Sequence, residues 1–248
     1  MKIVLSTESV KGYGLNRVFR FAKEAGFDGI DLAMENGNYD SLDSDYIKEL
    51  SDALTLPVVA IQTPKATSKT KIQEAVRMAK KLGARIVVIQ PPKLLDRKLV
   101  TWLKKEIPKI RQKENISIAL ENAPSKTMFG FLPEHAMNST SDLKAFKHVC
   151  LDTSRTAEKK EDLIKIYNSL KKYLVHVHLS NVYKNKPYAP PETGALPIES
   201  FLSKLKSDKF KGYISIRVKP KNFHVGNEDK MMEDLKSSLK FCRKYSEG

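Results

Sequence analysis

The sequence alternates short β-type runs with longer segments of helical periodicity, eight times from end to end. A strand needs a crossover to reach a parallel neighbour, and a helix after each strand supplies that crossover. Eight such units, spaced by roughly 25–35 residues, predict an α/β fold, a single (β/α)8 TIM barrel over residues 1–248. The expected strands lie at 2–7, 29–33, 58–63, 86–90, 116–121, 149–152, 174–180 and 213–218.

Apolar residues at helical spacing mark the segments between these strands. Leu15, Val18 and Phe19 share one face of the first segment, which ends at Gly26. Pro108 falls inside the fourth segment, where its ring and missing N–H predict a kink or an early end. The expected helices lie at 15–25, 43–54, 68–82, 95–113, 140–147, 158–172, 197–206 and 228–245.

The length of 248 residues is usual for one such barrel, and no run approaches the ~20 apolar residues that span a bilayer. The apolar part of Met1–Thr7 is too short for a signal peptide, so we expect a cytoplasmic protein with no membrane partner. In a reducing compartment, Cys150 and Cys242 are expected to be buried thiols rather than a disulfide.

The chain is basic, with a formal net charge of +15 at pH 7. Such a charge attracts polyanions, nucleic acids included. The lysines, however, are spread along every expected helix and form no basic block with interleaved aromatic residues, which favours a solvated surface of the kind found in heat-adapted proteins. Nucleic acid is therefore a disfavoured partner, while a preference for small anionic substrates fits both interpretations.

Ionisable residues stand at the carboxyl ends of four late strands. Because strand side chains alternate between the two faces of a sheet, Glu121, Asp152 and Arg217 end the inward-facing sets of their strands. The seventh strand carries His176 and His178 on one face, with His176 expected inside the barrel and His178 at its upper rim. Barrel enzymes carry their sites at this face. The predicted catalytic residues are Glu121, Asp152, His178 and Arg217.

Two interpretations of this group stay open at this point. Two carboxylates and one imidazole on neighbouring strands suit a divalent ion such as Mn²⁺, Mg²⁺ or Zn²⁺. The same residues can also form a buried network of ion pairs around Arg217. Asp31 and Glu35, beside the second strand, can line the pocket as well, although carboxylates near a strand end are more often solvated.

Six short segments are weak motifs one by one, but their order and spacing together are specific. They are Ala25–Asp31, Ala119–Asn122, Leu151–Arg155, His176–Leu179, Gly194–Pro197 and Lys211–Arg217. In this combination the chain resembles the xylose-isomerase-like TIM barrel superfamily, which includes sugar phosphate isomerases and epimerases and proteins of the AP endonuclease 2 type. The resemblance covers nearly the whole chain and implies the same barrel.

The resemblance also implies a metal site, from which this chain departs. In the isomerases and epimerases, one divalent ion is held by a Glu, an Asp, a His and a Glu on strands five to eight. Glu121, Asp152 and His178 match the first three positions, whereas Arg217 stands at the fourth. The two glutamates of that pattern also pass the proton of the substrate, so the change removes one of two bases as well as one metal ligand.

Further departures make the expected pocket more positive. Arg155 stands where the resemblance implies a histidine, three residues after the sixth-strand aspartate, and Lys184 loosely matches a basic residue that contacts the sugar. A positive rim suits a phosphorylated or carboxylated sugar. The residues expected to bind substrate are Arg155, Lys184, His176 and Asn122.

A guanidinium and a divalent cation are incompatible at close range, because their repulsion costs roughly tens of kcal/mol in a dry site before screening and several after it. Arg217 also supplies permanent positive charge to carboxylates that otherwise repel each other. Our hypothesis is that Arg217 takes the place of the metal and pairs with Glu121 and Asp152, so that the protein has no cofactor. The alternative is a divalent metal held by Glu121, Asp152 and His178.

The expected function is that of an isomerase- or epimerase-like enzyme, or a lyase, acting on a small sugar or sugar-like anion. Glu121 would serve as a single general base beside a substrate carbonyl polarised by Arg217. The alternative is a catalytically degenerate barrel that binds a metabolite or a partner without turnover. A metal-dependent isomerase with three protein ligands and a nucleic-acid binder are less favoured.

The histidine content argues against the endonuclease branch of the resemblance. Trinuclear zinc endonucleases need several histidines, some of them on early strands. This chain has 5 histidines, and none precedes His135. The sequence also lacks a Walker loop, a Gly-x-Gly-x-x-Gly fingerprint and a nucleophile elbow, so no nucleotide cofactor is implied.

Overall fold

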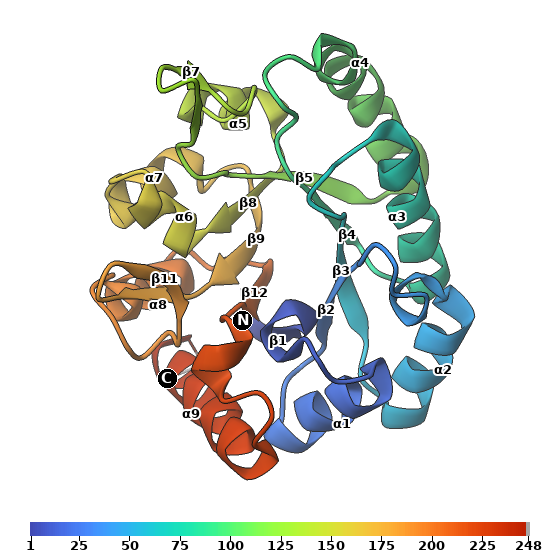
Figure 1. The fold of residues 1–248 in the computed structure, drawn as a ribbon, viewed down its shortest axis with the longest axis vertical. Coiled ribbons are helices and arrows are strands. Elements are labelled where there is room, and N and C mark those ends of the chain that lie inside the picture. Colours follow the sequence, from blue (N-terminus) through green and yellow to red (C-terminus); the bar gives the residue numbers. More distant parts are fainter. Residues whose placement is uncertain (247–248) are drawn as a thin grey trace.

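Parallel strands close into an eight-stranded barrel in the computed structural model, which describes residues 1–246 (Figure 1). The barrel strands are β1 (Lys2–Ser6), β2 (Ile30–Ala33), β3 (Val58–Gln62), β4 (Ile86–Ile89), β5 (Ser117–Glu121), β8 (Val149–Asp152), β9 (Leu174–Leu179) and β12 (Tyr213–Ile216). Neighbours in chain order pair in parallel, and β12 returns to β1, where Tyr213 pairs with Lys2. The predicted (β/α)8 TIM barrel is confirmed.

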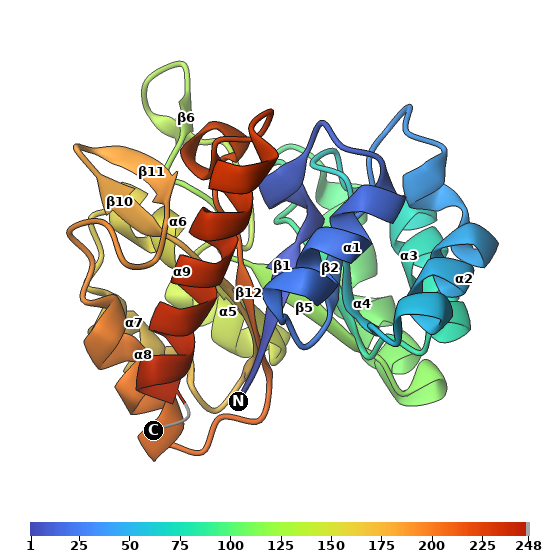
Figure 2. The ribbon, with the colours of Figure 1, turned by 90° about the horizontal axis from the view of Figure 1, so that it is seen from below.

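Helices cover the outside of the barrel (Figures 1 and 2). They are α1 (Leu15–Ala25), α2 (Ser44–Leu54), α3 (Lys69–Leu82), α4 (Arg97–Glu114), α5 (Thr140–Phe146), α6 (Thr153–Glu158), α7 (Leu163–Leu170), α8 (Ile198–Ser207) and α9 (Glu228–Ser246), with single 3-10 turns at η1 (Thr7–Val10), η2 (Asp40–Leu42) and η3 (Pro220–Phe223). The last helix, α9, packs against α1 and α8 beside β1 and so closes the helical layer. Within residues 1–246, no helix combines the length and the apolar composition that crossing a bilayer requires.

One predicted helix boundary is wrong. The helix predicted over 158–172 begins only at Leu163, as α7, because Asp162 caps it, and a separate short helix, α6, precedes it directly after β8, capped by Asp152. Of the two effects predicted for Pro108, the early end does not occur, since α4 continues to Glu114, close to the predicted end at 113. An interior proline costs roughly 3 kcal/mol, and the packing of the buried face of α4 against the barrel offsets that cost.

Each of the two long connections, 122–139 and 181–196, contains a small antiparallel hairpin that the sequence did not predict. The hairpins are β6 (Thr127–Met128) with β7 (Leu132–Pro133), and β10 (Asn181–Tyr183) with β11 (Lys186–Ala189). Lys184 and Asn185 both have positive φ, as a two-residue hairpin turn demands. Both hairpins lie at the end of the barrel opposite the N-terminus, over the carboxyl ends of the strands, which we call the upper face (Figure 2).

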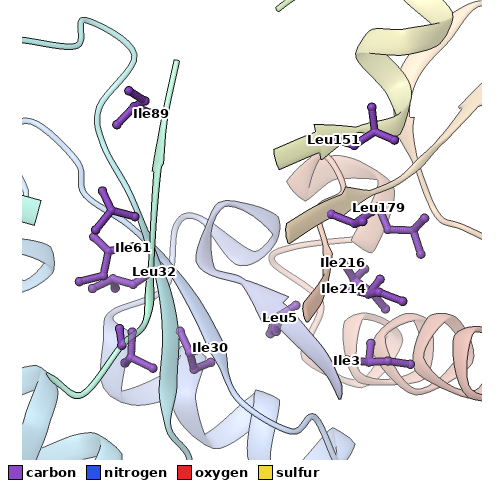
Figure 3. Close-up of a cluster of buried hydrophobic side chains, with 14 of the residues drawn as sticks. Ile3, Leu5, Ile30, Leu32, Ile61, Ile89, Leu151, Leu179, Ile214 and Ile216 are labelled. Carbon is purple, nitrogen blue, oxygen red and sulfur yellow. The ribbon is translucent and has the colours of Figure 1, made fainter. Parts of the chain in front are cut away.

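Strand alternation produces two buried layers. Outward-facing aliphatic side chains pack between the barrel and its helices, and Figure 3 shows part of this layer. A smaller set, which includes Val4, Val88 and Ala119, fills the barrel interior. The prediction that Ile118 faces outward and Ala119 inward is confirmed. Cys150 belongs to the interior set, and both cysteines are buried free thiols, as predicted.

Candidate functional site

Glu121, the last residue of β5, is fully buried among three cationic side chains. Its Oε1 accepts hydrogen bonds from His178 Nδ1 and, at 2.7 Å, from Arg217 Nη1, while its Oε2 accepts one from Arg155 Nη1. Burial by itself raises the pKa of this carboxyl, but the two arginines and His178 outweigh burial and hold the pKa well below its ordinary value. Glu121 is therefore ionised.

Asp152, the last residue of β8, faces the same two guanidiniums from the neighbouring strand. Its Oδ1 accepts a hydrogen bond from the backbone N–H of Arg155 at 3.0 Å, so the side chain also caps α6. Its Oδ2 lies 3.4 Å from Arg217 Nη1 and 3.5 Å from Arg155 Nε. Because these ionic contacts are long, burial raises the pKa of Asp152 more than the two arginines lower it.

His178, on β9, bridges two carboxylates inside the barrel. Its Nδ1 donates to Glu121, and its Nε2 donates to Asp31 Oδ2 at 2.9 Å. Ionised carboxylates only accept hydrogen bonds, so both ring nitrogens carry protons and the ring is a cation. Burial disfavours this charge, but Glu121 and Asp31 favour it more strongly and raise the pKa of His178 well above its ordinary value.

His176 lies next to His178, with the two rings edge to face and their centroids 5.0 Å apart. Its Nε2 donates to Asp31 Oδ2 at 3.2 Å, and its buried Nδ1 has no partner among the described residues. Burial lowers the pKa of His176 more than Asp31 raises it, so this ring is neutral. Burial raises the pKa of Asp31, but hydrogen bonds from the two histidines outweigh it and hold that pKa well below its ordinary value.

Carboxylates and cations meet in one continuous network of contacts. Three buried carboxylates face three cations, and Glu8 adds a partly exposed carboxylate at Arg217. We call this network the charge cluster; its members are Asp31, Glu121, Asp152, Arg155, His178 and Arg217. A buried charge is tolerated only when it is paired and hydrogen-bonded, so each member depends on the others.

The guanidiniums of Arg155 and Arg217 line the inner end of a cavity of about 450 Å³ at the upper face. Glu8, from η1, pairs with Arg217 Nη2 in the same cavity. The Tyr188 hydroxyl, from β11, accepts a hydrogen bond from Arg155 Nε at 3.2 Å, and the Tyr188 ring lies beside the Arg217 guanidinium. The carboxylates and the imidazole of the charge cluster do not line this cavity, so a ligand meets the guanidiniums first.

The structure brings most of the predicted site residues together. His178 lies at the level of the strand ends, in register with Asp152, but its side chain is wholly buried among the other members of the charge cluster and is not exposed at the rim. Lys184 lies outside the cavity, in the exposed turn of the β10–β11 hairpin, with its Nζ 5.2 Å from the centre of the Tyr183 ring. Asn122 is buried beside the cluster, where its side chain bonds the backbone N–H and C=O of Asp152.

Sequence reasoning missed Glu8 and Tyr188 as members of the site, and it named Asp31 only as a carboxylate that can line the pocket and is more often solvated. A signal for Asp31 was present, because Ile30 and Leu32 face the helices and alternation then places Asp31 inside the barrel. Glu8 and Tyr188 come from a 3-10 turn and a hairpin in the connections, where no periodic pattern predicts the position of a side chain.

Among the described residues, two groups bring potential metal ligands within 4.8 Å of one another: Glu121 with Asp152 and His178, and Cys150 with His176 and His178. In the first group Arg217 Nη1 lies 2.7 Å from Glu121, 3.4 Å from Asp152 and 3.0 Å from His178 Nδ1. The second group shares His178, whose nitrogens both carry protons, and burial raises the pKa of the Cys150 thiol to about 11. Neither group therefore presents a set of free ligands.

Residues 19–245 match the family model described as xylose isomerase-like TIM barrel. The chain belongs to this family. The match confirms the resemblance inferred from the sequence motifs and covers every strand of the barrel except β1.

Relatives of this xylose isomerase-like barrel cover its full length. "Uncharacterized protein ML2432" of Mycobacterium leprae (strain TN) is 25% identical over 281 residues, which span 99% of this chain and 98% of that protein. A solved D-tagatose 3-epimerase-like protein has a TM-score of 0.72 and 21% identity, with 98% and 99% of the two chains covered. The solved IolI protein with a bound zinc atom has a TM-score of 0.71 and 15% identity, with both chains covered to 100%. At these identities the two structures show the fold.

Replacing Glu121 with Gln should destabilise the protein, because the change leaves three cations facing a neutral amide. We expect the free energy of unfolding at pH 7, measured by urea denaturation, to fall by about 3–5 kcal/mol. Asp52→Asn is the control, since it removes an exposed pair with Lys48 and should cost less than about 1 kcal/mol.

Urea denaturation measured across pH tests whether Glu121, Asp31 and His178 are ionised in the folded protein. The pKa values of Glu121 and Asp31 lie below their ordinary 4.5 and 3.8, so their stabilisation is present above pH 4.5 and is lost as the pH falls. The pKa of His178 lies above 6.5, so its contribution is present below pH 6.5 and is lost only as the pH rises through the raised value. The difference in the free energy of unfolding between the wild type and Glu121→Gln should decrease as the pH falls. A difference that does not depend on pH contradicts this account.

Proposed function

We propose that this barrel binds a small sugar-like anion, phosphorylated or carboxylated, at its upper face and without a resident metal. The observation that carries the proposal is the pair of guanidiniums at the inner end of the cavity, where Arg155 and Arg217 are held by buried carboxylates. A guanidinium offers a fork of N–H donors that matches phosphate and carboxylate groups. Lys65 and Lys219 line the same cavity and add positive charge around a bound anion.

The cations already present support the metal-free part of the proposal. The carboxylates of the charge cluster are paired with Arg155, Arg217 and His178, so a dication bound to them would compete with these cations for the same oxygens. Arg217 Nη1 lies within 3.4 Å of all three candidate ligand atoms. An ion on those ligands would meet the guanidinium at close range, with a repulsion of several kcal/mol even after screening.

An isomerase- or lyase-type step on the bound sugar is the second candidate. Glu8 favours it, because its carboxylate faces the cavity beside Arg217, where a base can take a proton next to a carbonyl that Arg217 polarises. Glu121, the base predicted from the sequence, has both oxygens bonded to cations and no exposed surface. We therefore assign this role to Glu8. The D-tagatose 3-epimerase-like neighbour supports the reaction class by analogy of fold.

The substitution Glu8→Gln should tighten the binding of an anionic sugar. The Glu8 carboxylate competes with the ligand for Arg217, so its removal should lower the Kd of ribose 5-phosphate roughly fivefold, equivalent to about 1 kcal/mol for a partly exposed ion pair. Glu35→Gln is the matched control, because Glu35 lines the same cavity but pairs with Lys11 at 2.8 Å. Isothermal titration calorimetry measures both variants.

Neutral ribose serves as the ligand control in this titration. Equal binding of ribose and ribose 5-phosphate by the wild type, or an unchanged Kd in Glu8→Gln, contradicts the anion site. Where the wild type isomerises a sugar phosphate, Glu8→Gln should lose turnover despite its tighter binding, and Glu35→Gln should keep it.

Restoring the metal-site pattern of the resemblance should create a metal site. In Arg155→His/Arg217→Glu both guanidiniums give way to potential ligands, so we expect about one Mn²⁺ per chain by elemental analysis and a melting temperature that rises with added Mn²⁺. The wild type prepared in the same way should hold substoichiometric metal. Stoichiometric metal in the wild type, removed by a chelator and restored by added Mn²⁺, would overturn the metal-free proposal.

A further inference from the structure

A second cavity, of about 920 Å³, adjoins the first at the upper face. It is lined by the connections that follow β3, β4 and β5 and by the β10–β11 hairpin. The residues common to both cavities are Lys65, Arg155, Tyr188 and Lys219. A single ligand can therefore extend from the guanidiniums past Tyr188 into the second cavity, whose volume is in the range of pockets that hold small ligands.

The walls of the second cavity combine charged side chains with a group of apolar residues that are conformationally stiff. Four prolines line it, and a proline ring fixes the backbone φ of its residue: Pro91, Pro92, Pro124 and Pro187. Leu95 lies at the same cavity with 75% of its surface exposed, although a leucine gains by burial. Such walls favour a rigid apolar group over a flexible chain.

The charges of the side chains around the second cavity nearly cancel. Arg155 is already neutralised within the charge cluster. The other charged residues of the lining are four lysines and three carboxylates: Lys65, Lys93, Lys126, Lys219, Asp96, Glu134 and Glu158. A balanced lining attracts an uncharged group more readily than a second anion.

Two buried polar atoms at this cavity have no partner among the described residues. One is Nε2 of Gln90, a hydrogen-bond donor on a side chain that is 8% exposed. The other is Nδ1 of His135, and burial lowers the pKa of this ring, so it is neutral. A buried donor without an acceptor is unfavourable, so a ligand that supplies an acceptor to Gln90 is stabilised there.

We infer that the ligand has two ends: an anionic sugar on Arg155 and Arg217, and an uncharged ring with a hydrogen-bond acceptor in the second cavity, bonded to Gln90. This inference rests on the proposed anion site and extends it. The stiff walls favour a rigid ring, and the near balance of charges favours a ring without charge. The unpaired amide of Gln90 favours a hydrogen-bond acceptor on the edge of that ring.

Ribose 5-phosphate and nucleoside 5′-monophosphates test the inference as probes, because they share the anionic sugar and differ by an uncharged ring that carries acceptors. In calorimetry the wild type should bind uridine or adenosine 5′-monophosphate about tenfold more tightly than ribose 5-phosphate. Gln90→Met should reduce this gain roughly fivefold and leave the Kd of ribose 5-phosphate unchanged. Gln62→Met is the matched control, because Gln62 is also buried and lines the first cavity but not the second.

We expect Gln62→Met to keep the wild-type ratio between the Kd of ribose 5-phosphate and the Kd of each nucleotide. Leu95→Asp provides a second test at an exposed position, and it should also reduce the nucleotide gain without affecting folding. Equal affinity of the wild type for ribose 5-phosphate and both nucleotides overturns the two-ended ligand and leaves the anion site standing. Failure of every probe to bind overturns the proposed function itself. A full nucleotide gain in folded Gln90→Met overturns the hydrogen bond to Gln90.

Discussion

The ion pair between Arg217 and Glu121 is the interaction on which the upper face of this barrel depends. A carboxylate inside a barrel is costly unless cations and N–H donors surround it. Arg217 Nη1 reaches Glu121 at 2.7 Å and also faces Asp152, and Arg155 and His178 complete the shell. Without Arg217, two acids at neighbouring strand ends would share too little positive charge. Arg217, the residue after β12, thus supplies positive charge at the position where the resemblance in sequence implies a metal.

The same pairing orients the groups that a ligand meets. Arg155 is held by Glu121, by Asp152 and by the Tyr188 hydroxyl, so little side-chain freedom remains to be lost when an anion binds. Asn122 joins the end of β5 to the backbone of Asp152 and keeps the two acidic strand ends in register. The buried carboxylates therefore act on the ligand through the guanidiniums. The barrel is that of the xylose isomerase-like family, whereas its chemistry is set by the side chains at the strand ends.

Much of this arrangement follows from strand periodicity. Alternation predicted the eight barrel strands and the inward direction of Glu121, Asp152 and Arg217, because a side chain on a strand can take only two directions. The same rule applied to β2 would have placed Asp31 inside, beside the two histidines. The positions of side chains in segments without such periodicity were not predicted. Glu8 and Tyr188 reach the cavity from a 3-10 turn and a hairpin, and Lys184 lies in the exposed tip of that hairpin. An aspartate cap also starts α7 later than predicted, after a short helix that was not predicted. Their positions are set by contacts between distant segments rather than by local spacing.

The central claim is that paired buried carboxylates and cations hold the upper face together, with His178 as a cation beside Arg155 and Arg217. The protonation of His178 tests that claim most directly, because a nitrogen that carries a proton cannot ligate a metal. In protein labelled with ¹⁵N at histidine, the two ring nitrogens of His178 should both show directly bonded protons from mildly acidic to mildly alkaline pH, while His176 shows one. A neutral His178 ring at pH 7 with a free nitrogen, or His178 signals broadened by stoichiometric Mn²⁺, would contradict it.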